Sequence, residues 1–192
     1  AGEGRAFSAG FDLSGLDQQS DADLLYRFVR VEQLLQMIYQ LPMTSVALVQ
    51  GRCFGAAADI VASCRKRIAT PDASFRMPGL QFGIVLGTRR LARLIGADAA
   101  FDLLETSRIF TADDALETGF LTDIEPAEDW ASHIDKLAID AGNLGDDAKT
   151  ALLAATRDDR GLDHDLAALV RSAAKPGLAD RIRAFVATQV KK

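Results

Sequence analysis

The spacing of apolar positions along the chain predicts alternating helices and strands. Apolar side chains recur at helical spacing over residues 21–40 and stop before Pro42, which predicts one amphipathic helix. The short run TSVALVQ at 44–50 is apolar and contains β-branched side chains, so it indicates a buried strand. AAADIVASC at 56–64 predicts a tightly packed helix, and RKRIAT at 65–70 predicts another strand.

The second half of the chain becomes increasingly helical. Residues 88–106 predict one or two helices interrupted at Gly96, and Thr111 is a good N-cap for the acidic segment that follows it. FLTDIE at 120–125 predicts a last strand, and everything from Trp130 onward has helical spacing. Strands that alternate with helices indicate an α/β fold, followed here by an all-helical C-terminal region.

We therefore expect a core at residues 1–125 and a helical region at 126–192. The apolar positions of that region suit packing between subunits and equally suit core contacts within one subunit. The chain of 192 residues begins with Ala1 rather than Met, and it opens inside a strand-like segment, so we expect an N-terminal part to be missing. The sequence contains no apolar run of the length needed to cross a membrane, and we expect a cytoplasmic protein.

Charge and cysteine content narrow the classes of function. The net charge of −5 argues against nucleic-acid binding. Residues 52–93 nevertheless carry eight basic and two acidic side chains, a balance that suits either an anionic small ligand or a solvated face. The two cysteines, Cys53 and Cys64, lack the spacing of metal ligands, so we expect no metal site.

Two turns built from glycine and alanine carry the candidate chemistry. AFSAGFDL at 6–13 and QGRCFGAAADI at 50–60 both place small residues directly after a predicted strand. Such turns expose peptide N–H groups, and two of these groups that converge on one point form an oxyanion hole. The glycine patterns of dinucleotide-binding folds, phosphate-binding loops and serine-hydrolase elbows are all absent.

Four segments together resemble the enoyl-CoA hydratase/isomerase, or crotonase, family: RAFSAGFDL, VALVQGRCFGAAADI, IATPDASFRMPGLQFGIV and TADDALETGFLTDI. The resemblance implies a crotonase-like spiral of ββα units with C-terminal helices, assembled as a homotrimer or hexamer. It also implies an acyl-CoA substrate. Coenzyme A would then arrive as part of that thioester, with no separate cofactor.

The resemblance assigns the site position by position. The amides of Phe11 and Ala56 would hold the thioester carbonyl as an enolate forms. Asp59 lies three residues after Ala56, on the same helical face, and takes the place of the family's acid–base carboxylate. The second glutamate of the hydratases falls on Gly79, and the acid that other members use falls near Gly87.

The same motifs place Arg5, Ala6, Ala9, Gly10 and Gly55 around the coenzyme. Three further arginines flank the proposed site without an assigned role: Arg52, Arg76 and Arg89. A purely structural interpretation of Asp59 also stands, in which one of the arginines pairs with this buried carboxylate.

We therefore expect an acyl-CoA enzyme that stabilises a thioester enolate, with Asp59 moving a proton. Because a second carboxylate is missing, we do not expect efficient hydration, and isomerisation, decarboxylation and thioester hydrolysis stay open. One alternative is a non-catalytic acyl-CoA binder or structural subunit with the same fold. Another is an unrelated α/β module that binds a nucleotide.

Overall fold

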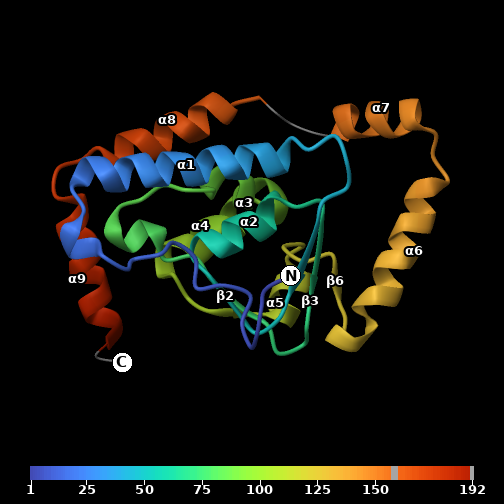
Figure 1. Cartoon of the computed structure of the whole chain (residues 1–192), viewed down its shortest axis with the longest axis horizontal. Helices are drawn as coiled ribbons and strands as arrows, with labels where there is room; N and C mark the ends of the chain where they lie inside the picture. The colour runs from blue at the N-terminus through green and yellow to red at the C-terminus, as the bar shows by residue number, and fades with distance from the viewer. Residues whose placement is uncertain (157–159, 191–192) are drawn as a thin grey trace.

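The computed structural model describes residues 1–156 and 160–190, and in it helices surround two small sheets (Figure 1). The strands are β1 (Val46–Val49), β2 (Arg52–Phe54), β3 (Lys66–Ala69), β4 (Ser74–Arg76), β5 (Phe110–Thr111) and β6 (Asp123–Ile124). The α-helices are α1 (Asp21–Tyr39), α2 (Ala56–Ser63), α3 (Thr88–Ile95), α4 (Ala97–Thr106), α5 (Ala112–Glu117), α6 (Trp130–Gly142), α7 (Asp146–Thr156), α8 (Leu162–Ala173) and α9 (Leu178–Val190). Three 3₁₀ helices are η1 (Leu16–Gln18), η2 (Gly79–Phe82) and η3 (Ala127–Asp129).

Two successive strand–strand–helix units form the centre of the molecule. The first unit is β1, β2 and α2, and the second is β3, β4 and, after η2, α3. Equivalent strands pair in parallel, so β1 lies beside β3, with Val49 opposite Ala69, and β2 lies beside β4, with Cys53 opposite Phe75. The strand β6 pairs with β3 in parallel and extends the first sheet. The strand β5 pairs with β4 in antiparallel and extends the second. This stacking is the ββα spiral that the family resemblance implied.

Helix α1 begins and packs as its apolar spacing predicted. Its N-cap Ser20 accepts a hydrogen bond from the Asp23 amide, and the Asp23 side chain accepts one from the Ser20 amide. The inward face buries Leu24, Phe28 and Leu35 almost completely. These side chains belong to a core that α1 shares with α8 and α9, so α1 joins the spiral to the C-terminal helices.

A second core lies between the two sheets and helices α2 to α5. Its centre is a triangle of aromatic rings from Phe75, Phe110 and Phe120, whose centroids lie 5.1–5.3 Å apart. The alanines of α2 bring that helix close to the sheets, and Ala57 and Ala58 are buried completely or almost so. The first residues of α2 are therefore fixed by close packing.

The C-terminal helices follow two different courses (Figure 1). Helix α8 runs along α1, and α9 packs on α1 and η2. The Asp21 carboxylate accepts hydrogen bonds from the amides of Gly177 and Ala179, which ties the start of α9 to the start of α1. Helices α6 and α7 instead stand away from the spiral, and neither buries a side chain over Trp130–Gly142 and Asp146–Thr156.

Most predicted boundaries are confirmed, and two strands are shorter than expected. The helical segment 88–106 breaks at Gly96, and Thr111 forms a capping box with Asp114. The predicted strand at 120–125 contains only β6, and the strand-like start at residues 6–8 makes a single bridge, from Ser8 to Cys53. None of the helices in the described part of the chain is long and apolar enough to cross a membrane.

Candidate functional site

The two glycine turns, far apart in the sequence, meet in space. Ser8 bridges Cys53, and the Phe54 amide donates a hydrogen bond to the Ser8 carbonyl over 3.0 Å. Gly10 then has a φ of +91° and lies against the second turn. A Cβ on Gly10 would lie 2.5 Å from the Phe54 oxygen and 3.0 Å from the Ala56 nitrogen. Only glycine therefore allows the two turns to approach this closely.

Each turn contains a peptide N–H group that has no acceptor in the described structure and whose residue lines a common cavity. Neither the Phe11 amide nor the Ala56 amide donates a hydrogen bond within residues 1–156 and 160–190. Ala56 is the first residue of α2, where a helix has no internal acceptor for its N–H group and the helix dipole favours negative charge. Two free donors thus lie beside a common cavity, which is one requirement of an oxyanion hole.

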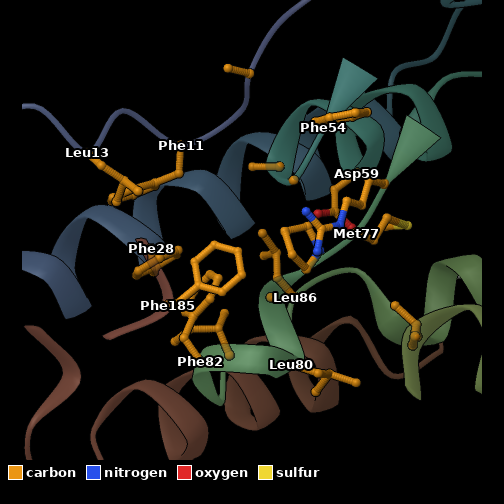
Figure 2. Close-up of a pocket in the computed structure, with 18 of the residues that line it drawn as sticks. Phe11, Leu13, Phe28, Phe54, Asp59, Met77, Leu80, Phe82, Leu86 and Phe185 are labelled. Carbon is orange, nitrogen blue, oxygen red and sulfur yellow. The ribbon is translucent and has the colours of Figure 1, made fainter. Parts of the chain in front are cut away.

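The cavity next to these amides has a volume of about 340 Å³ and is mostly apolar (Figure 2). Its apolar lining comes from the first turn, α1, β2, the segment from Met77 to Leu86, α4 and α9. The largest of these side chains are Phe11, Leu13, Phe28, Phe54, Met77, Leu80, Phe82, Ile84, Leu86, Leu104 and Phe185. Such a lining with few polar groups is typical of a site for a small organic ligand.

Asp59 supplies the carboxyl group of this cavity. In Figure 2 it lies beside Met77, on the other side of Leu86 from the rings of Phe28, Phe82 and Phe185. Its side chain is buried, and its Oδ1 accepts no hydrogen bond in the described structure. Burial raises the pKa of Asp59 from 3.8 to about 8. At neutral pH most Asp59 side chains are therefore protonated, with a minority present as a strong carboxylate base.

A buried ion pair lies behind Asp59. The Arg90 guanidinium donates two hydrogen bonds to the Glu32 carboxylate, over 2.5 and 2.9 Å, and Asp165 lies 3.6 Å away. Arg90 favours the ionised form of Asp59 and Glu32 opposes it, so the two influences on its pKa work against each other. Within the described residues Asp59 forms no ion pair of its own, which goes against a purely structural role in an ion pair.

Glycines occupy both positions where a second carboxylate would be expected. Gly79 lines the cavity. Apart from Asp59, no Asp or Glu among the described residues does so. Gly87 has a φ of +61°, and any Cβ there would overlap Oδ1 of Asp59. Position 87 thus touches the carboxyl group directly, and the absence of a side chain at Gly87 leaves the space that Asp59 occupies.

The other predicted residues divide between three hollows. Ala9, Gly55 and Arg76 line the cavity that contains Asp59. Gly10 faces a neighbouring hollow on the other side of Phe11. Arg5, Ala6 and Arg52 border a third one, together with Gly51 and Asp72.

The arginines that flanked the site in the sequence have specific partners. Arg76 donates hydrogen bonds to the Ser107 carbonyl and to Gln189, which connects β4 to α9 at the edge of the cavity. Arg89 pairs with Asp165. Within the described residues no group of three His, Cys, Asp or Glu side chains is arranged to hold a metal ion.

The sequence did not indicate the aromatic lining of the cavity. Phe28 belongs to the apolar face of α1, which the helical spacing identified only as core. Phe82 lies in η2 and Phe185 in α9, and their rings meet with centroids 5.0 Å apart. These two residues are 103 positions apart in the sequence, so only the docking of α9 on η2 shows that they line one site.

Sequence comparison with known proteins points to one family. The model of the enoyl-CoA hydratase/isomerase family matches residues 1–164. A Mycobacterium leprae protein assigned as an enoyl-CoA hydratase is 33% identical over 143 residues, which cover 71% of this chain and 56% of that protein. A Bacillus subtilis protein with the same assignment is 33% identical over 141 residues, covering 70% and 53%. The chain thus spans about half the length of these curated relatives.

Solved structures share the fold. A Bordetella parapertussis structure assigned as an enoyl-CoA hydratase/isomerase is 48% identical, with a TM-score of 0.94, and the match covers 97% of this chain and 78% of that one. Human mitochondrial delta3-delta2-enoyl-CoA isomerase is 22% identical, with a TM-score of 0.78 over 96% of this chain and 76% of that one. At that identity the likeness concerns the fold alone.

Proposed function

Because the chain belongs to the enoyl-CoA hydratase/isomerase family, we propose that it acts on acyl-CoA thioesters in the cavity beside Asp59. The thioester carbonyl oxygen accepts hydrogen bonds from the free amides of Phe11 and Ala56. Negative charge that develops on this oxygen is stabilised by both donors and by the N-terminus of α2. The observation that supports this proposal is that two residues with unpaired N–H groups, Phe11 and Ala56, line the same cavity as a buried carboxyl group.

The reaction we propose is a proton shift along the acyl chain, as in an isomerase. The Asp59 carboxylate takes a proton from the carbon next to the carbonyl, and the electron pair moves onto the oxygen to form an enolate. When that enolate is conjugated with a carbon–carbon double bond, Asp59 returns the proton two carbons further along the chain. The carboxylate is regenerated, and neither water nor a redox partner enters the reaction.

The single carboxyl group in the lining favours this reaction over hydration. Water addition needs one group to activate water and another to deliver a proton to carbon, whereas a proton shift needs one group in both roles. Gly79 and Gly87 cannot supply the second group. Burial makes Asp59 a stronger base than an exposed aspartate, at the expense of the fraction that is ionised at neutral pH.

Assays of Asp59→Asn with a panel of unsaturated acyl-CoAs test the reaction. We expect turnover to fall by about 10²–10⁴-fold, the usual contribution of a positioned acid–base group, while acyl-CoA binding is retained. Asp102→Asn, at an exposed position of α4, is the matched control and should behave as the wild type. For the wild type, kcat/KM should rise with pH to a plateau above about 8, because the ionised form of Asp59 is the base. Full activity of Asp59→Asn would refute the assignment.

One observation favours a second function, that of a non-catalytic acyl-CoA binder or structural subunit. Both positions for an additional carboxylate hold glycine, and the remaining carboxyl group is mostly protonated at neutral pH. The same panel decides between the two functions. Tight binding of acyl-CoAs without turnover of any of them, across the pH range, would favour the binder.

We also propose where the coenzyme portion of the substrate lies. It runs from the two amides past Ala9 and Gly10 toward the hollow at Arg5 and Ala6, so that coenzyme A arrives within the thioester and no separate cofactor is needed. Arg5 and Arg52 border that hollow, which has a volume of about 410 Å³. Their positive charge suits the phosphate groups of a coenzyme.

We further propose that the protein assembles as a homotrimer or hexamer through α6 and α7. These helices stand apart from the spiral and expose Ile139 on α6 and Leu152 on α7. These apolar side chains lie outside the two cores of the described structure and are free to contribute to a surface that packs against another chain. Light scattering should give the mass of three or six chains, and a monomer at micromolar concentration would contradict this assembly.

A further inference from the structure

A second hollow of about 340 Å³ lies on the other side of Phe11 from the cavity that contains Asp59. Parts of α1, α2 and the first glycine turn form its walls, and Val31, Leu34 and Ile60 supply much of the apolar surface. Phe11 and Ala56 line both spaces. The two residues whose amides are free therefore stand at the boundary between two hollows, each at the small end of the range for ligand sites.

The ring of Phe11 is held firmly at this boundary. It stacks on Phe28, with centroids 4.1 Å apart and an angle of 8° between the planes, and Figure 2 shows the two rings facing each other. The Arg27 guanidinium lies 4.4 Å from the centre of the same ring, so it covers the face that Phe28 leaves open. Arg27 is itself fixed by hydrogen bonds to the Asp12 carbonyl and the Gln19 side chain.

From this arrangement we propose that the Phe11 side chain is a partition that limits the size of the acyl group. The proposal rests on the proposed function, because it takes the cavity beside Asp59 as the space for the acyl chain. The backbone of Phe11 binds the carbonyl oxygen, and its ring closes the passage to the second hollow. The site is thereby restricted to short acyl groups, and removal of the ring would open the cavity toward the second hollow.

The test uses S-alkyl thioethers of coenzyme A, which cannot react, with butyl and decyl groups as the probes. Isothermal titration calorimetry compares the wild type with Phe11→Ala. We expect S-decyl-CoA to bind about tenfold more tightly to the variant, the gain for burying roughly two additional methylene groups. S-butyl-CoA should change little, because a thioether has no carbonyl oxygen and does not depend on the position of the Phe11 amide. Phe11→Leu should shift the same preference less, and it serves as the test if Phe11→Ala does not fold.

Phe101→Ala is the matched control, because Phe101 is an exposed phenylalanine on α4 outside both hollows. It should leave both affinities unchanged. Equal changes for the two thioethers in Phe11→Ala, or no change, would overturn the partition.

Titration with 1-butanol and 1-decanol separates this proposal from the proposed function. If neither thioether binds, but Phe11→Ala gains affinity for decanol and not for butanol, the partition stands and the proposed binding of coenzyme A fails. If no thioether and no alkanol binds to either protein, the cavity accepts no chain and the partition is refuted as well.

Discussion

The two glycine turns bring a free amide to the same cavity by different physical means. Ala56 begins a helix whose next two residues are buried, so the packing of the core fixes its N–H group. Phe11 lies in a loop joined to the sheet by a single bridge, and its own ring, between Phe28 and Arg27, holds it in place. A backbone donor can thus be positioned either by the element it begins or by the side chain attached to it.

This difference has an energetic side. The turn fixed by the core brings a carboxyl group with it, because Asp59 lies one helical turn after Ala56 and is buried along with the helix. The first turn buries no carboxyl group of this kind. Asp12, beside Phe11, is exposed and accepts hydrogen bonds from Ser14. We therefore expect the loss of folding stability that the site causes to come mainly from the buried Asp59 on α2.

The largest effect we predict is a pH-dependent gain in stability for Asp59→Asn. The raised pKa means that folded Asp59 binds its proton more tightly than unfolded Asp59, so wild-type stability falls as the pH rises from about 4 to about 8. Asparagine does not titrate, so the unfolding free energy of the variant should gain several kcal/mol relative to the wild type over that interval. Urea denaturation at a series of pH values measures this difference. If the unfolding free energies of the wild type and Asp59→Asn changed in parallel with pH, the predicted cost of burying Asp59 would be contradicted.

A smaller effect should distinguish the two turns in a comparison of Gly10→Ala with its matched partner, Gly55→Ala. Both positions have positive φ, so alanine strains each by about 1–3 kcal/mol. Only at Gly10 does the new methyl group also meet the Phe54 oxygen and the Ala56 nitrogen, whereas at Gly55 the nearest atom is 3.9 Å away. Gly10→Ala should therefore push the turns apart and lower kcat/KM by about 10²–10³-fold, the cost of one lost donor.

Gly55→Ala should mainly lower the folding stability, with a smaller effect on kcat/KM. Thermal unfolding measures the first quantity and the steady-state assay the second. An equal or larger loss of turnover in Gly55→Ala would show that the core does not protect the second turn. The contrast between a core-held amide and a side-chain-held amide would then be wrong.

Local signals in the sequence predicted much of this fold. The apolar spacing of α1, the cap at Thr111 and the break at Gly96 act within one or two helical turns, and the structure confirms all three. The proximity of Asp59 to Ala56 also follows from helix geometry alone. Glycine at positions 10 and 55 indicated two uncovered stretches of backbone, and the structure places those stretches side by side.

Features that depend on docking between distant segments were not predictable in the same way. The aromatic end of the cavity exists because α9 packs on η2, which brings Phe185 to Phe82. The stacking of the Phe11 ring on Phe28 likewise depends on where α1 lies, which no local pattern indicates. Arg5 is near the first motif in the sequence, but it borders a different hollow from Asp59.

The most direct test of the central claim is a crystal structure of Asp59→Asn with an unsaturated acyl-CoA bound. We predict that the thioester carbonyl oxygen lies about 2.7–3.1 Å from both the Phe11 nitrogen and the Ala56 nitrogen. A carbonyl oxygen bound elsewhere, or bonded to only one of these amides, would contradict the account.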